Sequence, residues 1–467
     1  MPFPARRPPA VFSTLLMGAL VLAVLAIGFF GSLAHAAGSP VHTTATDHTV
    51  TTLADDGPGS LRQAILAANS APGPATITFA VTGTIALASP LPLIVDDLTL
   101  QGPGAGSLAI SGAGLYRVLD ISPTLTNTVA VTVADLALVD GRAPDGEHGG
   151  AIRSHGDLQL LRSSLHDNSS PLSGSAIYAA AGSLAIVSSQ VQSNSAGSIY
   201  VEGAHTSITG TVLANNQGGA LVAIHAPTLH ITATQITSNT GRGIEAGYSD
   251  LDLADLQVNA NGDSGIASFL GTISLRDSVL IGNHSDEGGA IYSLWGAVIV
   301  TATLLQDNTA DSSGGGVYIA AGSSGLTMTH TILNANHAPY GGGIYLGGGA
   351  LQLHSAHLLA NVGNHGPALY FDSPQDGAVT DSCIANNWVT GLGGAAVELP
   401  SALTGTPVGI LSAPSSWWGA ADGPGGAGPG SGDSVDARVL YANFKTSPPA
   451  GCPLRSVSAQ YLPALRK

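Results

Sequence analysis

The feature that most constrains the fold is a motif that recurs along most of the chain. It consists of an asparagine turn, a short polar loop, a glycine cluster and an apolar-aromatic strand start, at intervals of 22 to 28 residues. Two columns therefore run in phase, which indicates a structural repeat. The apolar column is Ile152, Ile177, Ile199, Leu221, Ile244, Ile266, Ile291, Val317, Ile344, Leu369 and Val397, and the asparagine column is Asn168, Asn194, Asn216, Asn239, Asn261, Asn283, Asn308, Asn336, Asn361 and Asn386.

Between the two columns, apolar and polar residues alternate as they do in β-strands. Leu158-Gln159-Leu160 and Leu251-Asp252-Leu253 are examples. A unit of two or three short strands is too small to bury its own apolar face, so units of this kind stack as coils around a shared core. The repeat length suits one coil of a parallel β-helix. We therefore predict an all-β, right-handed parallel β-helix of roughly 11–14 coils.

The two columns have structural roles in such a stack. Equivalent residues of neighbouring coils lie roughly 4.8 Å apart, so an asparagine ladder can pass amide hydrogen bonds from coil to coil. Asparagine also tolerates the left-handed backbone of a tight turn. The glycine pairs permit positive φ and close approach of backbones. These columns thus predict architecture and no chemistry.

Residues 1–36 read as an export signal. Arg6 and Arg7 precede an apolar run, and Ala34-His35-Ala36 fits a small-x-small cleavage site. The run is also long enough for an uncleaved membrane anchor, although we favour cleavage. We expect a secreted or cell-surface protein that contacts membrane only through this segment.

The charge balance excludes some partners. The net charge is −16, only 9% of residues are charged, and the chain has two lysines. Nucleic-acid binding needs a basic surface, which this composition does not provide. A polyanionic substrate is also disfavoured unless a cation bridges the charges.

The stretch 48–145 differs from the repeats and is predicted to hold an N-terminal cap and the first coils. Ser60 and Gln63 form a capping box, and an apolar helical stripe follows at Leu61, Ala64, Ile65 and Ala68. We expect this short helix to cover the open end of the solenoid, whose strand edge would otherwise invite aggregation. Repeat coils should occupy 146–410, a closing segment 411–447 and a tail 448–467.

Here the sequence resembles known families. The segment 51–65, TTLADDGPGSLRQAI, resembles the N-terminal module of secreted bacterial β-helix proteins with a C-S-L-R-E-A (CSLREA-type) motif, although Gly59 replaces the Cys and Gln63 the Glu. The Asn-then-Gly-Gly-x-Ile-Tyr (GGAIY-type) repeats are similar to those of polymorphic outer-membrane proteins and adhesins. The resemblance implies a pectate-lyase-like fold outside the cell. It implies no single activity, because this fold hosts lyases, hydrolases and adhesins.

The C-terminal end is distinct again. Ser415-Ser416-Trp417-Trp418-Gly419 resembles the W-W-G closing segment of such solenoids. We interpret Trp388, Trp417 and Trp418 as an apolar plug for the last coil. Cys383 and Cys452 are a disulfide candidate in an oxidising compartment; alternatively, Cys383 is a buried small apolar residue.

The first candidate site is aromatic. If the apolar column points inward, Tyr292, Tyr318, Tyr345 and Tyr370 point outward and form a ladder on consecutive coils, with a shorter one starting at Tyr178 and Tyr200. Exposed rings suit sugar faces or an apolar partner. The competing interpretation is a stack that only stabilises the sheet.

The second candidate site is acidic. Asp250 and Asp252 should both face solvent, roughly 7 Å apart along a strand, a separation that suits inverting hydrolysis or Ca²⁺ chelation. Arg242 completes this catalytic hypothesis. Asp286 and Asp311 occupy matching turn positions on adjacent coils, where like charges repel unless a cation lies between them. A solvated acidic surface is the alternative for all four carboxylates.

Metal and cofactor signals are otherwise weak. His284 and His337 each follow a ladder asparagine, and His365 lies near another, but their spacing is that of a turn position. No Ser-His-Asp set or zinc spacing is readable. We expect no cofactor, with Ca²⁺ as the one considered.

Two functions are carried forward. The first is a non-catalytic protein that binds glycan or another cell-envelope surface, or has a structural surface role, through the tyrosine ladder. The alternative is a polysaccharide lyase or glycoside hydrolase, with Asp250, Asp252 and Arg242 in or near its site. The acidic, lysine-poor composition mildly favours binding over cleavage of polyuronates.

Overall fold

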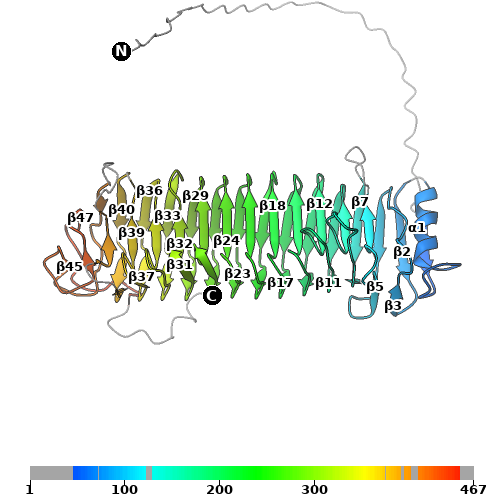
Figure 1. Ribbon diagram of the computed structural model, residues 1–467, viewed down its shortest axis with the longest axis horizontal. Coiled ribbons are helices and arrows are strands. Elements are labelled where there is room, and N and C mark those ends of the chain that lie inside the picture. The colour runs from blue at the N-terminus through cyan, green and yellow to red at the C-terminus, as the bar shows by residue number, and fades with distance from the viewer. Residues whose placement is uncertain are drawn as a thin grey trace, which may run out of the picture. The chain divides into compact units, whose positions relative to one another are not determined.

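The computed structural model describes residues 46–452, apart from 72, 122–128, 374, 391–393 and 401–408. The predicted signal at 1–36 and the tail beyond Cys452 lie outside the described residues. The described chain is a parallel β-helix whose coils stack along one axis (Figure 1). Three parallel sheets of 16, 13 and 14 strands run along the stack. We call them sheets A, B and C.

Sheet A carries the longest strands, most of which alternate buried and solvent-facing residues. It comprises β1 (Thr46–Val50), β2 (Ala75–Phe79), β4 (Leu98–Gln101), β7 (Ala130–Ala134), β10 (Asp157–Leu161), β13 (Ser183–Val187), β16 (His205–Thr209), β19 (Leu229–Thr232), β22 (Leu251–Ala254), β25 (Ile273–Arg276), β29 (Ala297–Thr301), β33 (Gly325–Thr329), β36 (Ala350–His354), β40 (Gly377–Thr380), β44 (Leu411–Ser412) and β47 (Val439–Leu440).

Sheet B follows sheet A within each coil and consists mostly of three-residue strands. It comprises β3 (Gly83–Ala86), β5 (Leu108–Ser111), β8 (Ala137–Val139), β11 (Ser164–His166), β14 (Gln190–Gln192), β17 (Val212–Ala214), β20 (Gln235–Thr237), β23 (Gln257–Asn259), β26 (Val279–Ile281), β30 (Leu304–Gln306), β34 (Ile332–Asn334), β37 (His357–Leu359) and β41 (Cys383–Ala385).

Sheet C contains the apolar-aromatic column of the repeat. It comprises β6 (Leu119–Ile121), β9 (Ile152–Ser154), β12 (Ile177–Ala180), β15 (Ile199–Glu202), β18 (Leu221–Ile224), β21 (Ile244–Gly247), β24 (Ile266–Phe269), β28 (Ile291–Leu294), β32 (Val317–Ile319), β35 (Ile344–Leu346), β39 (Leu369–Phe371), β43 (Val397–Glu398), β45 (Gly425–Gly426) and β46 (Ser434–Val435).

Two further strand pairs form outside these sheets, between the asparagine turn and sheet C. They are β27 (His284–Glu287) with β31 (Thr309–Ser313), and β38 (Val362–Gly363) with β42 (Trp388–Val389). The stack therefore agrees with the expected β-helix and is slightly longer than the expected 11–14 coils. The additional coils lie at the ends, where the asparagine and glycine columns are missing from the sequence.

The N-terminal cap is the predicted helix. Helix α1 spans Leu61–Ser70, and the Ser60 hydroxyl accepts a hydrogen bond from the Gln63 amide. Its buried residues are Leu61, Ala64, Ile65 and Ala68, which confirms the predicted stripe. α1 packs on β1 and β2 and so covers the first coil. No helix among the described residues is both long and apolar enough to cross a bilayer.

The buried asparagine ladder joins sheets B and C. Asn308 is fully buried; its Nδ2 donates to the Leu280 carbonyl at 2.9 Å and to Asn336 Oδ1 at 3.0 Å. Asn283 donates to Asn308 Oδ1 in the same way. Every amide group is thereby satisfied without water, which a buried polar residue requires. The ladder fixes the register of the coils.

The last rungs of this ladder correct the sequence prediction. Asn387, not Asn386, accepts from Asn361, because Asn386 takes the positive-φ turn position (62°) that precedes each ladder residue. Asn387 in turn donates to Asp433 Oδ2 at 2.7 Å. An aspartate therefore closes the ladder, and its burial raises the pKa of Asp433 to about 6.

The C-terminal plug contains two of the three predicted tryptophans. Trp417 and Trp418 are buried, whereas Trp388 is 68% exposed. The prediction for Trp388 was wrong because the residue belongs to the outlying pair β38–β42 rather than to the last coil. Cys383 and Cys452 are joined by a disulfide, with their Cα atoms 6.0 Å apart.

Candidate functional site

The outward face of sheet C carries one column of side chains in register over twelve strands. Parallel pairing places each residue opposite its counterpart on the next coil. The buried apolar column lies one residue earlier on each strand, so this column faces outward. It reads, from the N-terminal end, Asp120, Arg153, Tyr178, Tyr200, Val222, Glu245, Ala267, Tyr292, Tyr318, Tyr345, Tyr370 and Glu398.

The four tyrosines near its C-terminal end form a continuous stack, here called the tyrosine ladder: Tyr292, Tyr318, Tyr345 and Tyr370. Successive ring centroids are 5.3, 5.0 and 5.4 Å apart, with interplanar angles of 10° to 14°. The inner rings are covered on both faces by their neighbours. Their outward surface is therefore the ring edge and hydroxyl, not the flat face that we expected to meet a sugar.

The hydroxyls of the tyrosine ladder remain protonated at neutral pH. Burial raises the pKa of Tyr345 and of Tyr370 to about 12, helped by the nearby Asp372. Burial and Glu287 also raise the pKa of Tyr318. The ladder thus presents a row of hydroxyl groups, of which those of Tyr318 and Tyr345 are hydrogen-bonded to Glu287 and Asp372.

A second, shorter stack lies in the same column. Tyr178 and Tyr200 stack at 5.7 Å, and the His148 ring lies parallel to both, at 4.8 and 5.0 Å. The Tyr178 hydroxyl donates to Glu202 at 3.0 Å. Burial and this hydrogen bond raise the pKa of Tyr178 to about 12. The predicted shorter ladder therefore exists and contains an additional histidine.

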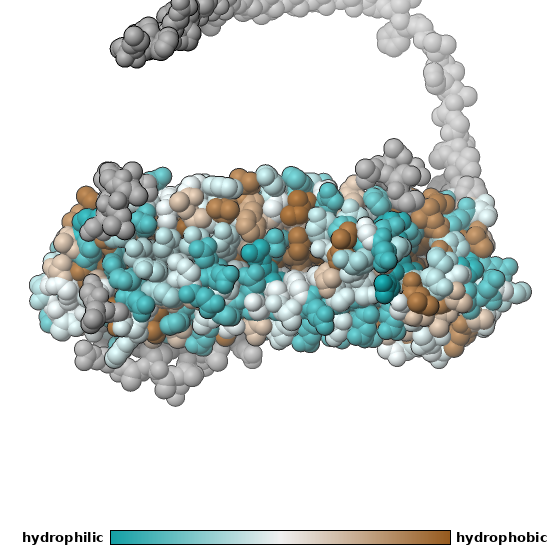
Figure 2. Space-filling model, in the orientation of Figure 1, coloured by the Kyte–Doolittle hydropathy of each residue, from teal (hydrophilic) through white to brown (hydrophobic). Residues whose placement is uncertain are grey.

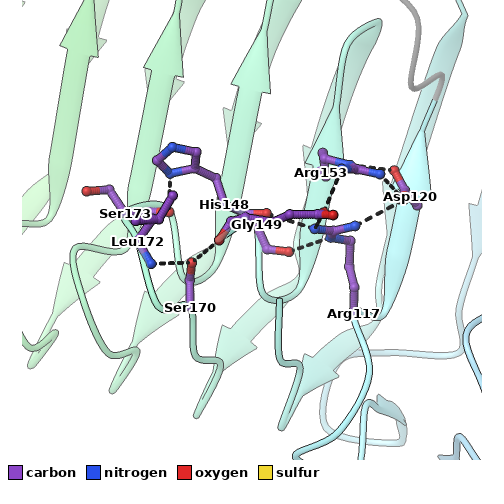
Figure 3. Close-up of polar contacts among 9 residues, drawn as sticks. Arg117, Asp120, His148, Gly149, Arg153, Ser170, Leu172 and Ser173 are labelled. Carbon is purple, nitrogen blue, oxygen red and sulfur yellow. Dashed lines mark hydrogen bonds and ion pairs between the residues drawn. The ribbon is translucent and has the colours of Figure 1, made fainter. Parts of the chain in front are cut away.

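A charged cluster anchors this end of the column (Figure 3). Arg153 donates to both oxygens of Asp120, at 2.9 and 2.6 Å. Arg117, which is nearly buried, donates to Asp120 and Glu147. The two cations and two anions thus satisfy one another. Because Arg117 also binds the carbonyls of His148 and Gly149, the cluster holds the His148 loop in place.

His155 lies at the edge of the same stack, 6.0 Å from Tyr178 in an edge-on arrangement. Burial, together with the neighbouring Arg153, lowers the pKa of His155, so its ring is neutral at neutral pH. Its Nδ1 is buried and has no hydrogen-bond partner among the described residues. The sequence contains no local signal for this cluster, because its members, from Arg117 to Tyr178, lie on three separate coils.

Between the two aromatic stacks, the column changes to Val222, Glu245 and Ala267, and a polar cleft opens beside it. The cleft has a volume of about 370 Å³. It is built partly by β27 and β31, the outlying strands that raise one wall. Its lining residues are Arg242, Asp263, Asp286, Glu287, Tyr292 and Ser312.

The cleft is acidic with one central cation. Arg242 Nη1 is 3.0 Å from Glu245, and its Nε is 3.4 Å from Asp263. The guanidinium also lies over the Phe269 ring, 5.3 Å from its centroid. Burial raises the pKa of both Tyr292 and Tyr318, and the neighbouring Glu287 carboxylate raises it further. Carboxylates and a tyrosine hydroxyl thus meet in one hollow.

The predicted acidic residues fall into separate places. Asp250 and Asp252 line a different cavity of about 540 Å³, on sheet A. Asp252 bridges Arg276 at 2.6 Å and His230 at 2.9 Å, and these bonds lower the pKa of Asp252. Arg242 does not line this cavity. The structure therefore separates the three residues that the catalytic hypothesis placed together.

Asp286 and Asp311 lie on paired strands but have different partners. Asp286 lines the cleft, whereas Asp311 pairs with His284 at 3.0 Å. The β27–β31 pairing runs from Ser285 opposite Ala310 to Glu287 opposite Ser313, so Asp286 lies opposite the irregular segment that contains Asp311 and Ser312. The described residues contain no group of three or more His, Cys, Asp or Glu arranged to hold a metal ion.

Comparisons with known proteins agree with the fold. Residues 151–304, about a third of the chain, match the family model described as "Right handed beta helix region". No curated protein matches the sequence.

Solved structures similar to the chain include three enzymes that act on polysaccharides. They are the mannuronan C-5 epimerase AlgE4 A-module of Azotobacter vinelandii (TM-score 0.36, 11% identity, 86% of this chain and 100% of that chain), a GH87 alpha-1,3-glucanase from Streptomyces thermodiastaticus (0.39, 15%, 81% and 69%), and a mannuronic acid specific polysaccharide family 6 lyase from human gut microbiota (0.36, 9%, 85% and 91%). These TM-scores and identities are low, so the likeness carries no conclusion about chemistry. The chain contains a right-handed β-helix region, and its described residues form a right-handed parallel β-helix.

Proposed function

We propose that the protein is a glycoside hydrolase that binds an extended, uncharged polysaccharide along the outward column of sheet C. The observation that carries this proposal is that two aromatic stacks in one column flank a cleft lined by carboxylates. Hydrolysis of a glycosidic bond requires a pair of carboxyl groups beside the bond. A polymer that crosses the cleft would contact both stacks.

The proposed chemistry uses the residues of the cleft. Glu287, which lines the cleft beside Tyr292, is the proposed proton donor to the leaving oxygen. Asp263 is the proposed base or nucleophile, and Arg242 holds it in position from 3.4 Å. Asp286 is the other carboxylate of the wall and the alternative partner for Glu287.

The charge of the cleft favours an uncharged substrate. Three carboxylates line it, with Glu245 paired to its single guanidinium. A uronate would meet net negative charge, and Arg242 is already engaged by two acids. This argument supports hydrolysis of a neutral glycan over elimination from a polyuronate.

The test is an assay for new reducing ends with a panel of neutral and acidic polysaccharides, with and without a chelator. We expect cleavage of a neutral member, and a loss of at least 100-fold in rate for Glu287→Gln. Asp311→Asn is the matched control, because this carboxylate lies on the neighbouring strand outside the cleft. Normal turnover by Glu287→Gln would contradict the assignment. If cleavage were lost only when the chelator is present, the reaction would instead require Ca²⁺.

The second candidate function is glycan binding without catalysis, on the cell surface. It is favoured by the tyrosine ladder, which offers repeated hydroxyls on consecutive coils whether or not the cleft is active. Binding of a polysaccharide that is never cleaved, and that is weakened by Tyr345→Ser, would support this function over the first. Export through residues 1–36 is a proposal common to both functions.

A further inference from the structure

A row of bulky side chains occupies the turns between sheets C and A on four consecutive coils. The residues are His225, Tyr248, Leu270 and Trp295, each directly after a sheet C strand, and we call them the exposed ridge. Tyr248 is 60% exposed, Leu270 40% and Trp295 55%. His225 and Tyr248 stack at 4.7 Å.

The backbone of the exposed ridge is strained. All four residues have positive φ, between 53° and 61°, a conformation that disfavours bulky side chains. The same turn position holds Ala181 and Gly203 on the two preceding coils. Each strained residue costs of the order of 1–3 kcal/mol, and about half of the surface of Tyr248, Leu270 and Trp295 stays exposed to solvent. The stability of the fold therefore does not account for the ridge.

The exposed ridge lies beside the sheet A cavity, although none of its four residues lines that cavity. His225, Tyr248 and Leu270 each stand two residues before a lining residue on the same coil, namely Pro227, Asp250 and Thr272. The fourth, Trp295, extends the ridge by one coil. A Cβ at Gly322 would come within 2.9 Å of its ring, so Gly322 leaves room for the ring over the next coil.

The cavity beside the exposed ridge is polar, and hydrogen bonds hold its carboxylates in place. Its volume is about 540 Å³. Asp252 is held by Arg276 and His230, and Asp250 accepts a hydrogen bond from the Thr272 amide at 2.7 Å. The lining further contains Thr228 and Ser274. Hydroxyls and oriented carboxylates thus face a hollow that lies beside the exposed ridge.

We infer that the exposed ridge and this cavity form a second carbohydrate-binding site, separate from the cleft on sheet C. A sugar ring has an apolar face, which suits an exposed aromatic ring, and an equatorial rim of hydroxyls, which suits Asp250, Asp252 and the threonines. The carboxylates exclude uronates, so the ligand is a neutral polysaccharide. Because the ridge continues over four coils, it takes a polymer lying along the axis. A protein partner would need a broader apolar patch than a ridge one residue wide.

The site is tested by affinity electrophoresis of the mature chain through gels that contain neutral or acidic polysaccharides. We expect a neutral member to retard the wild type. Tyr248→Gly and Trp295→Gly should each weaken retardation at least tenfold, without unfolding, because glycine accepts the positive φ. Ala181→Gly is the matched control: it changes the same turn position two coils before the ridge and should leave retardation unchanged.

Each other outcome overturns the inference. Wild-type migration that no polysaccharide alters, or equal retardation of the ridge variants, excludes the site. So does a change in sedimentation of Trp295→Gly, which would make the ridge an interface between copies. Failure of the cleft is recognised separately, because Glu287→Gln abolishes release of reducing ends whereas the ridge variants retain it on short oligosaccharides.

Discussion

Two aromatic surfaces of this β-helix differ in their position on the coil, in their burial and in their backbone conformation. The tyrosine ladder lies on strands, its rings are half-buried, and each inner ring packs between two others. The exposed ridge lies on turns, and its residues adopt an unfavourable backbone conformation and remain in solvent. We therefore expect the first surface to stabilise the stack on which it sits and the second to destabilise it. The comparison shows that aromatic residues repeated from coil to coil are not by themselves evidence of binding.

The face of the molecule in Figure 2 fits this distinction. Hydrophobic residues there form separate brown patches among hydrophilic ones, and they are spread along the stack. A surface of this kind lacks one large apolar area for a protein partner. Narrow aromatic strips beside polar cavities remain, and they suit an extended, amphipathic polymer.

The largest effect should come from the buried ladder on which both surfaces depend. Asn308→Ala should lower the free energy of unfolding by about 4 kcal/mol, because it leaves buried donors of Asn283 without acceptors. Chemical denaturation measures this. An exposed asparagine, Asn364, is the control. A loss below 1 kcal/mol for Asn308→Ala would show that the register is held mainly by the apolar core.

The end of that ladder should give the next largest effect. The pKa of Asp433 is raised from 3.8 to about 6, so its contribution to stability is fully present below pH 4 and is lost as the pH rises to 6. Asp433→Asn removes this titration and keeps an acceptor for Asn387. The variant should therefore gain about 3 kcal/mol over the wild type between pH 4 and pH 7.

Thermal unfolding followed over pH tests this prediction. Asp422→Asn is the control. Hydrogen bonds from Ser431 lower the pKa of the exposed Asp422, so its pKa shift has the opposite direction to that of Asp433. If the difference in stability between Asp433→Asn and the wild type stayed constant over this pH range, the pKa of Asp433 would not be raised in the folded protein.

Truncation within the tyrosine ladder should have an intermediate effect. Tyr318→Ser removes two stacked contacts and half-buried apolar area, and should cost about 2 kcal/mol of stability. Val222→Ser changes the same column in the gap between the stacks and should cost clearly less. Equal losses in urea unfolding would mean that ring stacking contributes nothing beyond burial.

The smallest effect should have the opposite sign. Tyr248 has a positive φ of 53°, which glycine adopts without strain, so Tyr248→Gly should stabilise the chain by about 1 kcal/mol. Ala181→Gly, where less bulk is removed, should stabilise it by less. A loss of stability in Tyr248→Gly would show that its stacking with His225 outweighs the strain, and the contrast between the two surfaces would disappear.

The fold was predicted well from the sequence because residues at the same position of successive repeats stack on one another in the folded chain. The asparagine and apolar columns, the capping helix and the register of Tyr292 to Tyr370 all follow from periodicity. A column of buried hydroxyls before sheet B, with Ser163, Ser189 and Thr211 among its members, was also readable but was missed. Its signal is weak because serine and threonine are common in the strands as well.

The candidate sites were harder to predict from the sequence than the fold was. Asp250 and Arg242 are eight residues apart, yet they face different cavities because the chain turns from sheet C to sheet A between them. The cleft brings together Asp263, Asp286 and Ser312 from three coils, and its depth depends on the outlying strands β27 and β31. Neither sequence distance nor repeat phase predicts such walls.

The sequence alone specifies the coil, because a period of about 24 residues with alternating apolar positions can bury its apolar faces only by stacking. It also determined which residues share a column, since parallel pairing preserves phase. The tertiary structure alone decided what each column presents to solvent. Whether a ring shows its face or its edge, and which carboxylates share a hollow, depends on distances of a few ångströms between neighbouring coils, and these follow from packing rather than from period.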